Sequence, residues 1–273
     1  MNRKWLIVLP NLFTVSSIFC GIYAIVLATG AQGDSAPQDF FRAAVAILFG
    51  MFFDGCDGRV ARLTRTQSDF GVQLDSLADV ITFGVAPALL LYKWALAPLG
   101  IWGVGVAGIY ATCGALRLAR FNVMASDEAG PSNYFTGLPI PLAAGMVVAV
   151  VVAATQSTEH PAMVPPVPVA ILSLVLSYLM VSTIRYHSFK KVKLHARELA
   201  VLASVLLFGA IVAIRLRPSF VLVAYFSGYV LLGLVEEIVF RRRREAELSL
   251  AAAPAAMGVE REQGGEDEDD GDA

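Results

Sequence analysis

Charged residues are scarce in this chain of 273 residues. Only 16% of the residues are Asp, Glu, Lys or Arg, whereas 56% are hydrophobic and the mean hydropathy is +0.64. Because a soluble domain has about a quarter charged residues, this composition excludes an ordinary soluble protein. The net charge of -2 combines a basic run with an acidic tail and gives no support for nucleic-acid binding.

Cysteine and histidine are equally rare, with three of each. No CxxC pair occurs, because the cysteines stand apart in apolar segments at Cys20, Cys56 and Cys113. We therefore predict neither a disulfide framework nor a zinc site and interpret these cysteines as small buried hydrophobic residues. The histidines lie in predicted loops without ligand spacing, which indicates surface or capping roles.

Long apolar stretches, in contrast, are abundant. A spanning helix needs about 20 residues, and eight stretches qualify at about 10–30, 38–58, 72–96, 101–121, 138–155, 164–184, 198–214 and 218–240. Segments rich in Gly, Pro, Asp and Ser separate them. A signal peptide after Arg3 and Lys4 is the alternative for the first stretch, but no small-x-small cleavage site follows. The sequence predicts an all-α, polytopic integral membrane helical bundle with about eight transmembrane helices.

The basic residues predict the orientation, since Lys and Arg in short loops favour the cytoplasmic side. With a cytoplasmic N-terminus, all but four of the 21 Lys and Arg residues fall on that side. The exceptions are Arg42, Lys93, Arg215 and Arg217. We therefore expect both termini in the cytoplasm, and the protein in the cytoplasmic membrane of the cell.

The composition changes after Arg244 to Ala, Gly, Glu and Asp. Such a segment cannot bury enough apolar surface to fold. We predict a membrane domain over residues 1–244 and a disordered acidic cytoplasmic tail over 245–273.

Four aspartates stand at or near membrane depth in the second and third predicted spans. Residues three and four apart share one face of a helix, so the second predicted span has a polar stripe made of Asp54, Asp57, Gly58, Ala61 and Arg62. The next span has a second stripe, made of Gly71, Asp75 and Asp79. Because the linker Leu63–Phe70 is short and polar, the two helices are expected to be antiparallel neighbours with facing stripes.

Converging carboxylates repel each other and are costly to desolvate near lipid, so they need cations. A site made of oxygen atoms suits Mg²⁺ or Mn²⁺, and four carboxylates are enough for two ions that act in phosphoryl transfer. Small residues at Gly58, Ala61 and Gly71 leave room for a bulky group. Arg62 and Ser68 can donate to phosphate oxygens. A divalent-cation transporter remains an alternative, although Arg62 and the glycines favour a phosphate-bearing substrate.

The pattern D-x2-D-G-x2-A-R-x8-G-x3-D-x3-D is complete from Asp54 to Asp79 and resembles the signature of the CDP-alcohol phosphatidyltransferases. This resemblance implies a helical membrane enzyme, usually a homodimer, in which an alcohol attacks the phosphate of a CDP-linked lipid and releases CMP. It implies two divalent ions held by the aspartates Asp54, Asp57, Asp75 and Asp79. It also implies that Asp79 is the general base and that the CDP-lipid contacts Gly58, Arg62 and Ser68.

Further motifs resemble the membrane-embedded bacterial branch of the family that makes phosphatidylserine. They are the segments 10–14 with Gly21, 75–79 leading into 83–88, 116–122 and 135–139. Ser17 and Thr82 depart from the expected Asn and Ser, but both keep a hydrogen-bonding group. The resemblance implies CDP-diacylglycerol and L-serine as substrates. It extends the expected CDP-lipid site to Asn11, Thr14, Ala61 and Gly71.

The acceptor alcohol decides between this branch and sister enzymes that use inositol phosphate or glycerol phosphate. A phosphorylated acceptor needs a pocket rich in Arg or Lys, whereas the serine carboxylate needs one cation or a few N–H donors. Arg117 and Arg120, at the expected cytoplasmic end of the fourth span, are the candidates. The alternative is that both only anchor the helix at the membrane surface. The active site is expected near the cytoplasmic face.

Overall fold

The computed structural model describes residues 3–64, 66, 68–127, 134–157, 164–182, 185–187, 222–228 and 230. Its long helices are α1 (Arg3–Gly30), α2 (Ala36–Thr64), α3 (Asp69–Asp79), α5 (Ile101–Asp127), α6 (Ile140–Ser157) and α7 (Pro166–Val181). The shorter elements are η1 (Gly33–Ser35), η2 (Val80–Val85), α4 (Ala86–Leu91), η3 (Tyr92–Leu96), η4 (Ala97–Leu99), β1 (Tyr134–Thr136) and β2 (Arg185–His187).

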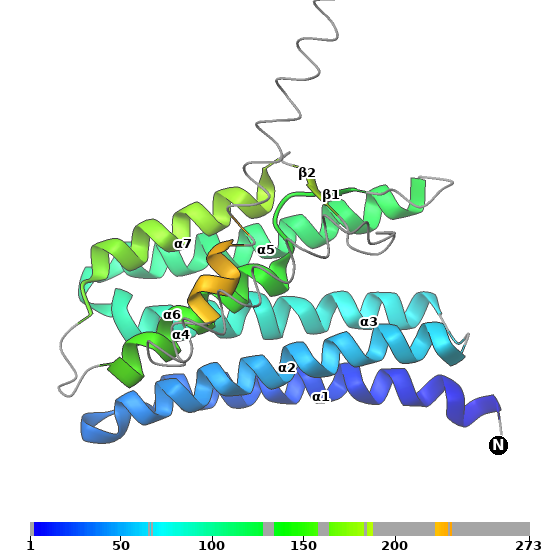
Figure 1. The fold of residues 1–273 in the computed structure, drawn as a ribbon, viewed down its shortest axis with the longest axis horizontal. Helices are drawn as coiled ribbons and strands as arrows, with labels where there is room; N and C mark the ends of the chain where they lie inside the picture. The colour runs from blue at the N-terminus through cyan, green and yellow to red at the C-terminus, as the bar shows by residue number, and fades with distance from the viewer. Residues whose placement is uncertain are drawn as a thin grey trace, which may run out of the picture.

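The first two helices form a long antiparallel hairpin at one edge of the bundle (Figure 1). The turn between them includes Gly33, whose φ of 60° is a conformation that glycine adopts without strain. Small side chains let the two helices approach closely, and the buried ones include Ala24, Ala28, Ala43 and Ala44. Helix α1 also packs against α3, so α1 lies against both helices that carry the aspartates.

The third span is one apolar run from Asp69 to Leu99 that changes its helical form along its length. It starts as α3, widens into a π-helix over Val80–Val85, and continues through α4. Its middle lies in the core, where Phe83, Leu90 and Leu91 are completely buried. The core of the bundle therefore lies directly beyond the end of α3.

Three described helices are long and apolar enough to cross a membrane, namely Pro10–Gly30, Asp69–Leu99 and Ile101–Met124. Two shorter apolar helices cover Ile140–Gln156 and Pro166–Val181. These five helices match five of the predicted spans, and the second predicted span lies inside α2. The seventh lies outside the described residues, as does most of the eighth, so the count of eight stays a prediction. The acidic tail also lies outside them.

The helical fold class is confirmed, and two local expectations need correction. Strands β1 and β2 form a short antiparallel pair, in which Phe135 lies opposite Tyr186. His187 therefore lies in a strand and not in a loop. Each strand supplies hydrogen-bond partners for the backbone of the other. The two strands are far apart in sequence, so no local pattern indicates that they pair. In addition, α2 extends through Thr64 and α3 begins at Asp69, so the linker is shorter than Leu63–Phe70. Ser68 starts α3 early because its side chain caps the helix.

Candidate active site

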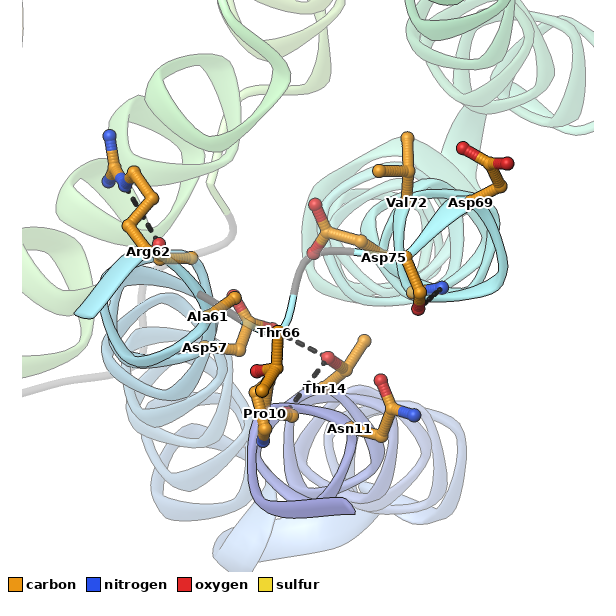
Figure 2. Close-up of a pocket in the computed structure, with 13 residues that line it drawn as sticks. Pro10, Asn11, Thr14, Asp57, Ala61, Arg62, Thr66, Asp69, Val72 and Asp75 are labelled. Atoms are coloured by element: carbon orange, nitrogen blue, oxygen red, sulfur yellow. Dashed lines mark hydrogen bonds between the residues drawn. The ribbon is translucent and has the colours of Figure 1, made fainter. Parts of the chain in front are cut away.

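A pocket of about 560 Å³ lies between α1, α2 and the start of α3 (Figure 2). Helix α1 lines it with Pro10, Asn11 and Thr14, and α2 lines it with Asp57, Gly58, Ala61 and Arg62. The remaining wall consists of Thr66, Ser68, Asp69, Gly71, Val72 and Asp75. All seven residues that the sequence assigns to the CDP-lipid thus line one pocket.

The carboxylates of α2 and α3 converge at the inner end of this pocket. Ligand atoms of Asp54, Asp57 and Asp75 lie within 4.8 Å of one another. The carboxyl group of Asp54 is also within hydrogen-bonding reach of both Asp75 and Asp79. Figure 2 shows the Asp75 carboxylate pointing from α3 toward α2. The two predicted stripes therefore face each other, and Asp79 joins the cluster through Asp54.

The cluster has the donor set and the unmet bonding capacity that a divalent cation requires. One carboxylate oxygen of Asp75 and one of Asp79 (Oδ1 in each) are buried without a hydrogen-bond partner. Within the described part of the chain, none of the four aspartates forms an ion pair with Lys or Arg. Buried carboxylates need a compensating charge, and a site of oxygen atoms suits Mg²⁺ or Mn²⁺. These residues therefore fit a divalent-metal site.

The side chain of Thr14 is engaged by the cluster and not free in the pocket. Its hydroxyl group donates to Oδ2 of Asp57 at 2.7 Å and lies 3.3 Å from the carbonyl oxygen of Pro10. Thr14 and Asp57 are both buried. Helix α1 therefore holds a carboxylate in place, although it contributes no carboxylate itself.

The other pocket wall depends on a helix cap. The backbone N–H of Gly71 donates to Oγ of Ser68 at 3.1 Å. A Cβ atom on Gly71 would lie 3.2 Å from Ser68 Oγ, so a larger residue would displace that hydroxyl group, and 3.5 Å from Asn11 Oδ1, which is ordinary contact. The Ser68 hydroxyl hydrogen remains able to donate to a ligand in the pocket.

Arg62 lies at the rim of the pocket. Its Nε atom donates to the carbonyl oxygen of Gly58 at 2.8 Å, within its own helix. Figure 2 shows its guanidinium group pointing away from Asp75 and Asn11. Arg62 is exposed, so in this structure it borders the site without entering it.

The structure separates the two arginines of α5. Arg117 is 8% exposed, lies over the Phe121 ring at 5.5 Å, and has a buried Nε atom without a partner. It is near enough to Asp79 for their opposite charges to attract. Arg120 is exposed, and its Nη1 atom donates to the carbonyl oxygen of Val181 at 3.3 Å. Only Arg117 faces the carboxylate cluster.

The sequence alone did not reveal two polar contacts next to the aspartates. Asn122 of α5 donates to the Ser76 hydroxyl at 2.8 Å, and Thr82 donates to the carbonyl oxygen of Ser17 at 3.0 Å. Both bonds connect helices that are distant in sequence. Spacing gives a partial signal, since Ser17 is three residues after Thr14 and Thr82 three after Asp79.

Comparison with known proteins identifies the family. The family model for CDP-alcohol phosphatidyltransferases matches residues 7–236. The chain belongs to the CDP-alcohol phosphatidyltransferase family. The family resemblance of the segment from Asp54 to Asp79 is thereby confirmed. The apolar helices are consistent with a membrane enzyme of this family.

Several relatives of this phosphatidyltransferase have the same name. The CDP-diacylglycerol–serine O-phosphatidyltransferase of Helicobacter pylori is 38% identical over 243 residues, which cover 87% of this chain and 96% of the relative. That of Bacillus subtilis is 39% identical over 191 residues, covering 70% and 94%. That of Saccharomyces cerevisiae is 39% identical over 144 residues, covering 51% of each.

Proposed function

We propose that this enzyme transfers a phosphatidyl group from CDP-diacylglycerol to the hydroxyl group of L-serine, forming phosphatidylserine and CMP. The observation that carries the proposal is the similarity to the Helicobacter pylori serine enzyme, which extends over 96% of that relative. Membership in a family of transferases favours this reaction over the cation-transporter alternative.

The pocket between α1, α2 and α3 is the proposed site for the CDP-lipid. Ser68 is free to donate a hydrogen bond to phosphate, and Asn11 offers an amide group beside it. The small residues of the wall, Gly58, Ala61 and Gly71, leave the backbone accessible, while Thr14 acts through Asp57. Arg62 bonds Gly58 through Nε alone, which leaves its Nη groups to donate to phosphate.

The four aspartates are the proposed ligands of two divalent ions, Mg²⁺ or Mn²⁺. When bound, the ions neutralise the diphosphate and the charge that develops during transfer. The orphaned oxygen atoms of Asp75 and Asp79 support this assignment, because a buried carboxylate oxygen without a partner is costly.

Asp79 is the proposed general base. The serine oxygen forms a bond to the phosphorus atom of the phosphatidyl group while the bond from phosphorus to the CMP oxygen breaks. The proton of the serine hydroxyl passes to Asp79, and CMP leaves with the electron pair. An aspartate is a weak base at neutral pH, so Asp79 depends on placement beside the reacting hydroxyl.

Arg117 is the proposed partner of the serine carboxylate. Among the residues whose side-chain burial the structure describes, it is the one buried basic group, and it lies near Asp79. A single cation matches an amino-acid carboxylate, whereas inositol phosphate or glycerol phosphate would bring a dianion that needs more basic groups. Arg117 therefore favours serine over a phosphorylated acceptor.

An acceptor panel tests the proposed reaction. Purified enzyme with CDP-diacylglycerol should release CMP with L-serine and much less CMP with glycerol 3-phosphate or inositol phosphate. The Asp79→Asn variant serves as the background control. Faster CMP release with either phosphorylated acceptor would refute the serine assignment while leaving the reaction class intact.

The cellular arrangement is proposed as well. We infer a multi-pass homodimer in the cytoplasmic membrane, with both termini, the acidic tail and the active site on the cytoplasmic side. The bias of basic residues supports this orientation. The pocket lies at the end of the bundle where α2 connects to α3, which is also where α1 begins (Figure 1).

A further inference from the structure

A buried polar contact lies one helical turn below the carboxylate cluster. Thr82 is completely buried, and its hydroxyl group donates to the backbone carbonyl oxygen of Ser17 at 3.0 Å. The Ser17 hydroxyl in turn donates to Oγ1 of Thr82 at 3.4 Å. This reciprocal pair joins α1 to the π-helical segment that comes after α3.

Two glycines enclose Thr82 from opposite helices. A Cβ atom on Gly21 of α1 would lie 2.8 Å from Thr82 Oγ1 and 2.9 Å from its Cα atom. A Cβ atom on Gly50 of α2 would lie 2.5 Å from Thr82 Cγ2. Real Cβ atoms do not approach so closely, so both positions require glycine while Thr82 stays where it is. Thr82 is therefore held between the backbones of α1 and α2.

This contact is in register with the active site on all three helices. Ser17 comes three residues after Thr14, Gly50 four residues before Asp54, and Thr82 three residues after Asp79. Residues with these spacings share a helix face. The polar contact and the carboxylate cluster are thus consecutive layers of the same three-helix interface.

The backbone between the two layers is irregular. Helix α3 ends at Asp79, and the chain widens into the π-helix Val80–Val85. Such a turn is rare and often occurs at a functional site, and it rotates the helix before it relative to the helix after it. The Tyr110 hydroxyl of α5 lies 3.4 Å from the carbonyl oxygen of Phe83 and donates to it. The widened segment is held by neighbouring helices at Thr82 and at Phe83.

We infer that the Thr82–Ser17 pair, enclosed by Gly21 and Gly50, sets the depth and rotation of α3 so that Asp79 meets Asp54. Thr82 is a positioning residue, since it acts through Asp79 and touches no substrate. The inference rests on the proposed function, because it assigns a role in the same site. The two positions that depart from the expected motif, Ser17 and Thr82, contact each other through their side chains.

Thr82→Val tests the inference, because valine keeps the methyl contact with Gly50 and replaces only the hydroxyl group, by a second methyl group. We expect kcat and Mn²⁺ affinity, the latter measured by electron paramagnetic resonance, to fall about tenfold or more, as for other outer-shell residues of metal sites. The KM for serine should stay unchanged. Thr82→Ser, which retains the hydroxyl group, should restore both kcat and Mn²⁺ affinity.

Ser177→Ala is the matched control. It removes another buried hydroxyl group, bonded to the Ser173 carbonyl oxygen inside α7, far along the chain from the site. It should lower the melting temperature without changing kcat or Mn²⁺ affinity. If Thr82→Val behaves like this control, Thr82 is only a packing residue and the inference is wrong.

Two further results keep the test decisive. If Thr82→Val does not fold, Ser17→Ala removes one bond of the pair and should shift kcat and Mn²⁺ affinity in the same direction; unchanged values overturn the inference. If the wild-type enzyme binds Mn²⁺ but prefers another acceptor, the serine assignment fails and the Thr82 effect on Mn²⁺ affinity still stands. If it binds no Mn²⁺, the metal proposal fails, and the kinetics of Thr82→Val test the inference alone. A lower kcat with an unchanged KM for serine then supports the positioning role, and an unchanged kcat overturns it.

Discussion

The hydroxyl group of Thr14 donates a hydrogen bond to Oδ2 of Asp57 at 2.7 Å, and both side chains are buried. A hydrogen bond to an ionised carboxylate is about twice as strong as a neutral one. This bond fixes the carboxyl group of Asp57, which has a ligand atom within 4.8 Å of those of Asp54 and Asp75. Helix α1 is therefore part of the proposed metal site through Thr14, although the family signature begins only at Asp54.

The first prediction concerns Thr14. Thr14→Val should weaken Mn²⁺ binding about ten- to hundredfold, because a hydrogen bond to a charged group contributes about 1.5–3 kcal/mol. Thr14→Ser keeps the hydroxyl group and should bind Mn²⁺ almost normally. Titration followed by electron paramagnetic resonance measures both. A raised KM for CDP-diacylglycerol with normal Mn²⁺ affinity would instead show that Thr14 contacts the lipid substrate.

The second prediction is metal dependence. EDTA should abolish CMP release, and Mg²⁺ or Mn²⁺ should restore it, because Asp75 and Asp79 each have a buried oxygen without a partner. A ligand that binds only the folded state stabilises it, so either ion should also raise the melting temperature of the wild-type enzyme. The Asp75→Asn variant should lose most of that rise. Full turnover in metal-free buffer would rule out the two-ion site.

The third prediction separates chemistry from binding on α3. Asp79→Asn should lower kcat by about 10² or more, the usual scale for a general acid or base, while the KM for CDP-diacylglycerol changes little. Asp69→Asn is the matched control, since Asp69 lines the same pocket, is exposed, and lies outside the carboxylate cluster. Near-normal kcat in Asp79→Asn would remove Asp79 from the mechanism.

Helical spacing predicted the convergence of the aspartates because the period of a helix is a local property. Asp54 and Asp57 are three apart, Asp75 and Asp79 four apart, and a short linker forces the two faces together. The same argument could not reveal the Thr14–Asp57 bond, since their 43-residue separation carries no period. The resemblance implies Asn11 and Thr14 in the CDP-lipid site, whereas the contact of α1 with the carboxylate cluster came from the structure.

Two other features were also hidden from local reasoning. The segment after Asp79 contains no proline until Pro87, so the sequence has no helix-breaking residue that would predict the π-helix at Val80. Arg117 and Arg120 have the same charge and the same neighbourhood in sequence, and residues three apart share one face of a helix, so spacing does not distinguish them. In the folded structure Arg117 is buried against Phe121, whereas Arg120 bonds to Val181 of α7. This difference depends on the packing of α7 and cannot be read from the sequence.

The fourth prediction concerns orientation. Single cysteines introduced at Gly33 and at Gln263, in a background without the three native cysteines, should react with membrane-impermeant reagents from opposite faces. Gly33 lies in the turn between α1 and α2, at the opposite end of the hairpin from the pocket (Figure 1). Lys93→Cys, on the same expected side as Gly33, is the matched control. Labelling of Gly33 and Gln263 from one side would contradict the placement of both termini in the cytoplasm.

The last prediction is that Arg117, and not Arg120, recognises the acceptor. Arg117 has a buried Nε donor without a partner, close to the proposed base Asp79, so an incoming carboxylate would satisfy a group that the protein leaves unbonded. Arg120 already donates to the carbonyl oxygen of Val181 and joins α5 to α7. An unbonded buried donor gains more from a ligand than an exposed one that has a partner.

Arg117→Gln should therefore raise the KM for serine about ten- to hundredfold at saturating CDP-diacylglycerol, which corresponds to one lost charge-assisted bond. The KM for CDP-diacylglycerol should change little, because Arg117 does not line the pocket between α1, α2 and α3. Arg120→Gln, the matched control, should lower the melting temperature with the serine KM near its wild-type value. Steady-state kinetics with serine as the varied substrate distinguishes the two residues. If Arg120→Gln alone raises the serine KM, the assignment is reversed; if neither variant does, the serine carboxylate is held by N–H donors and not by an arginine of α5.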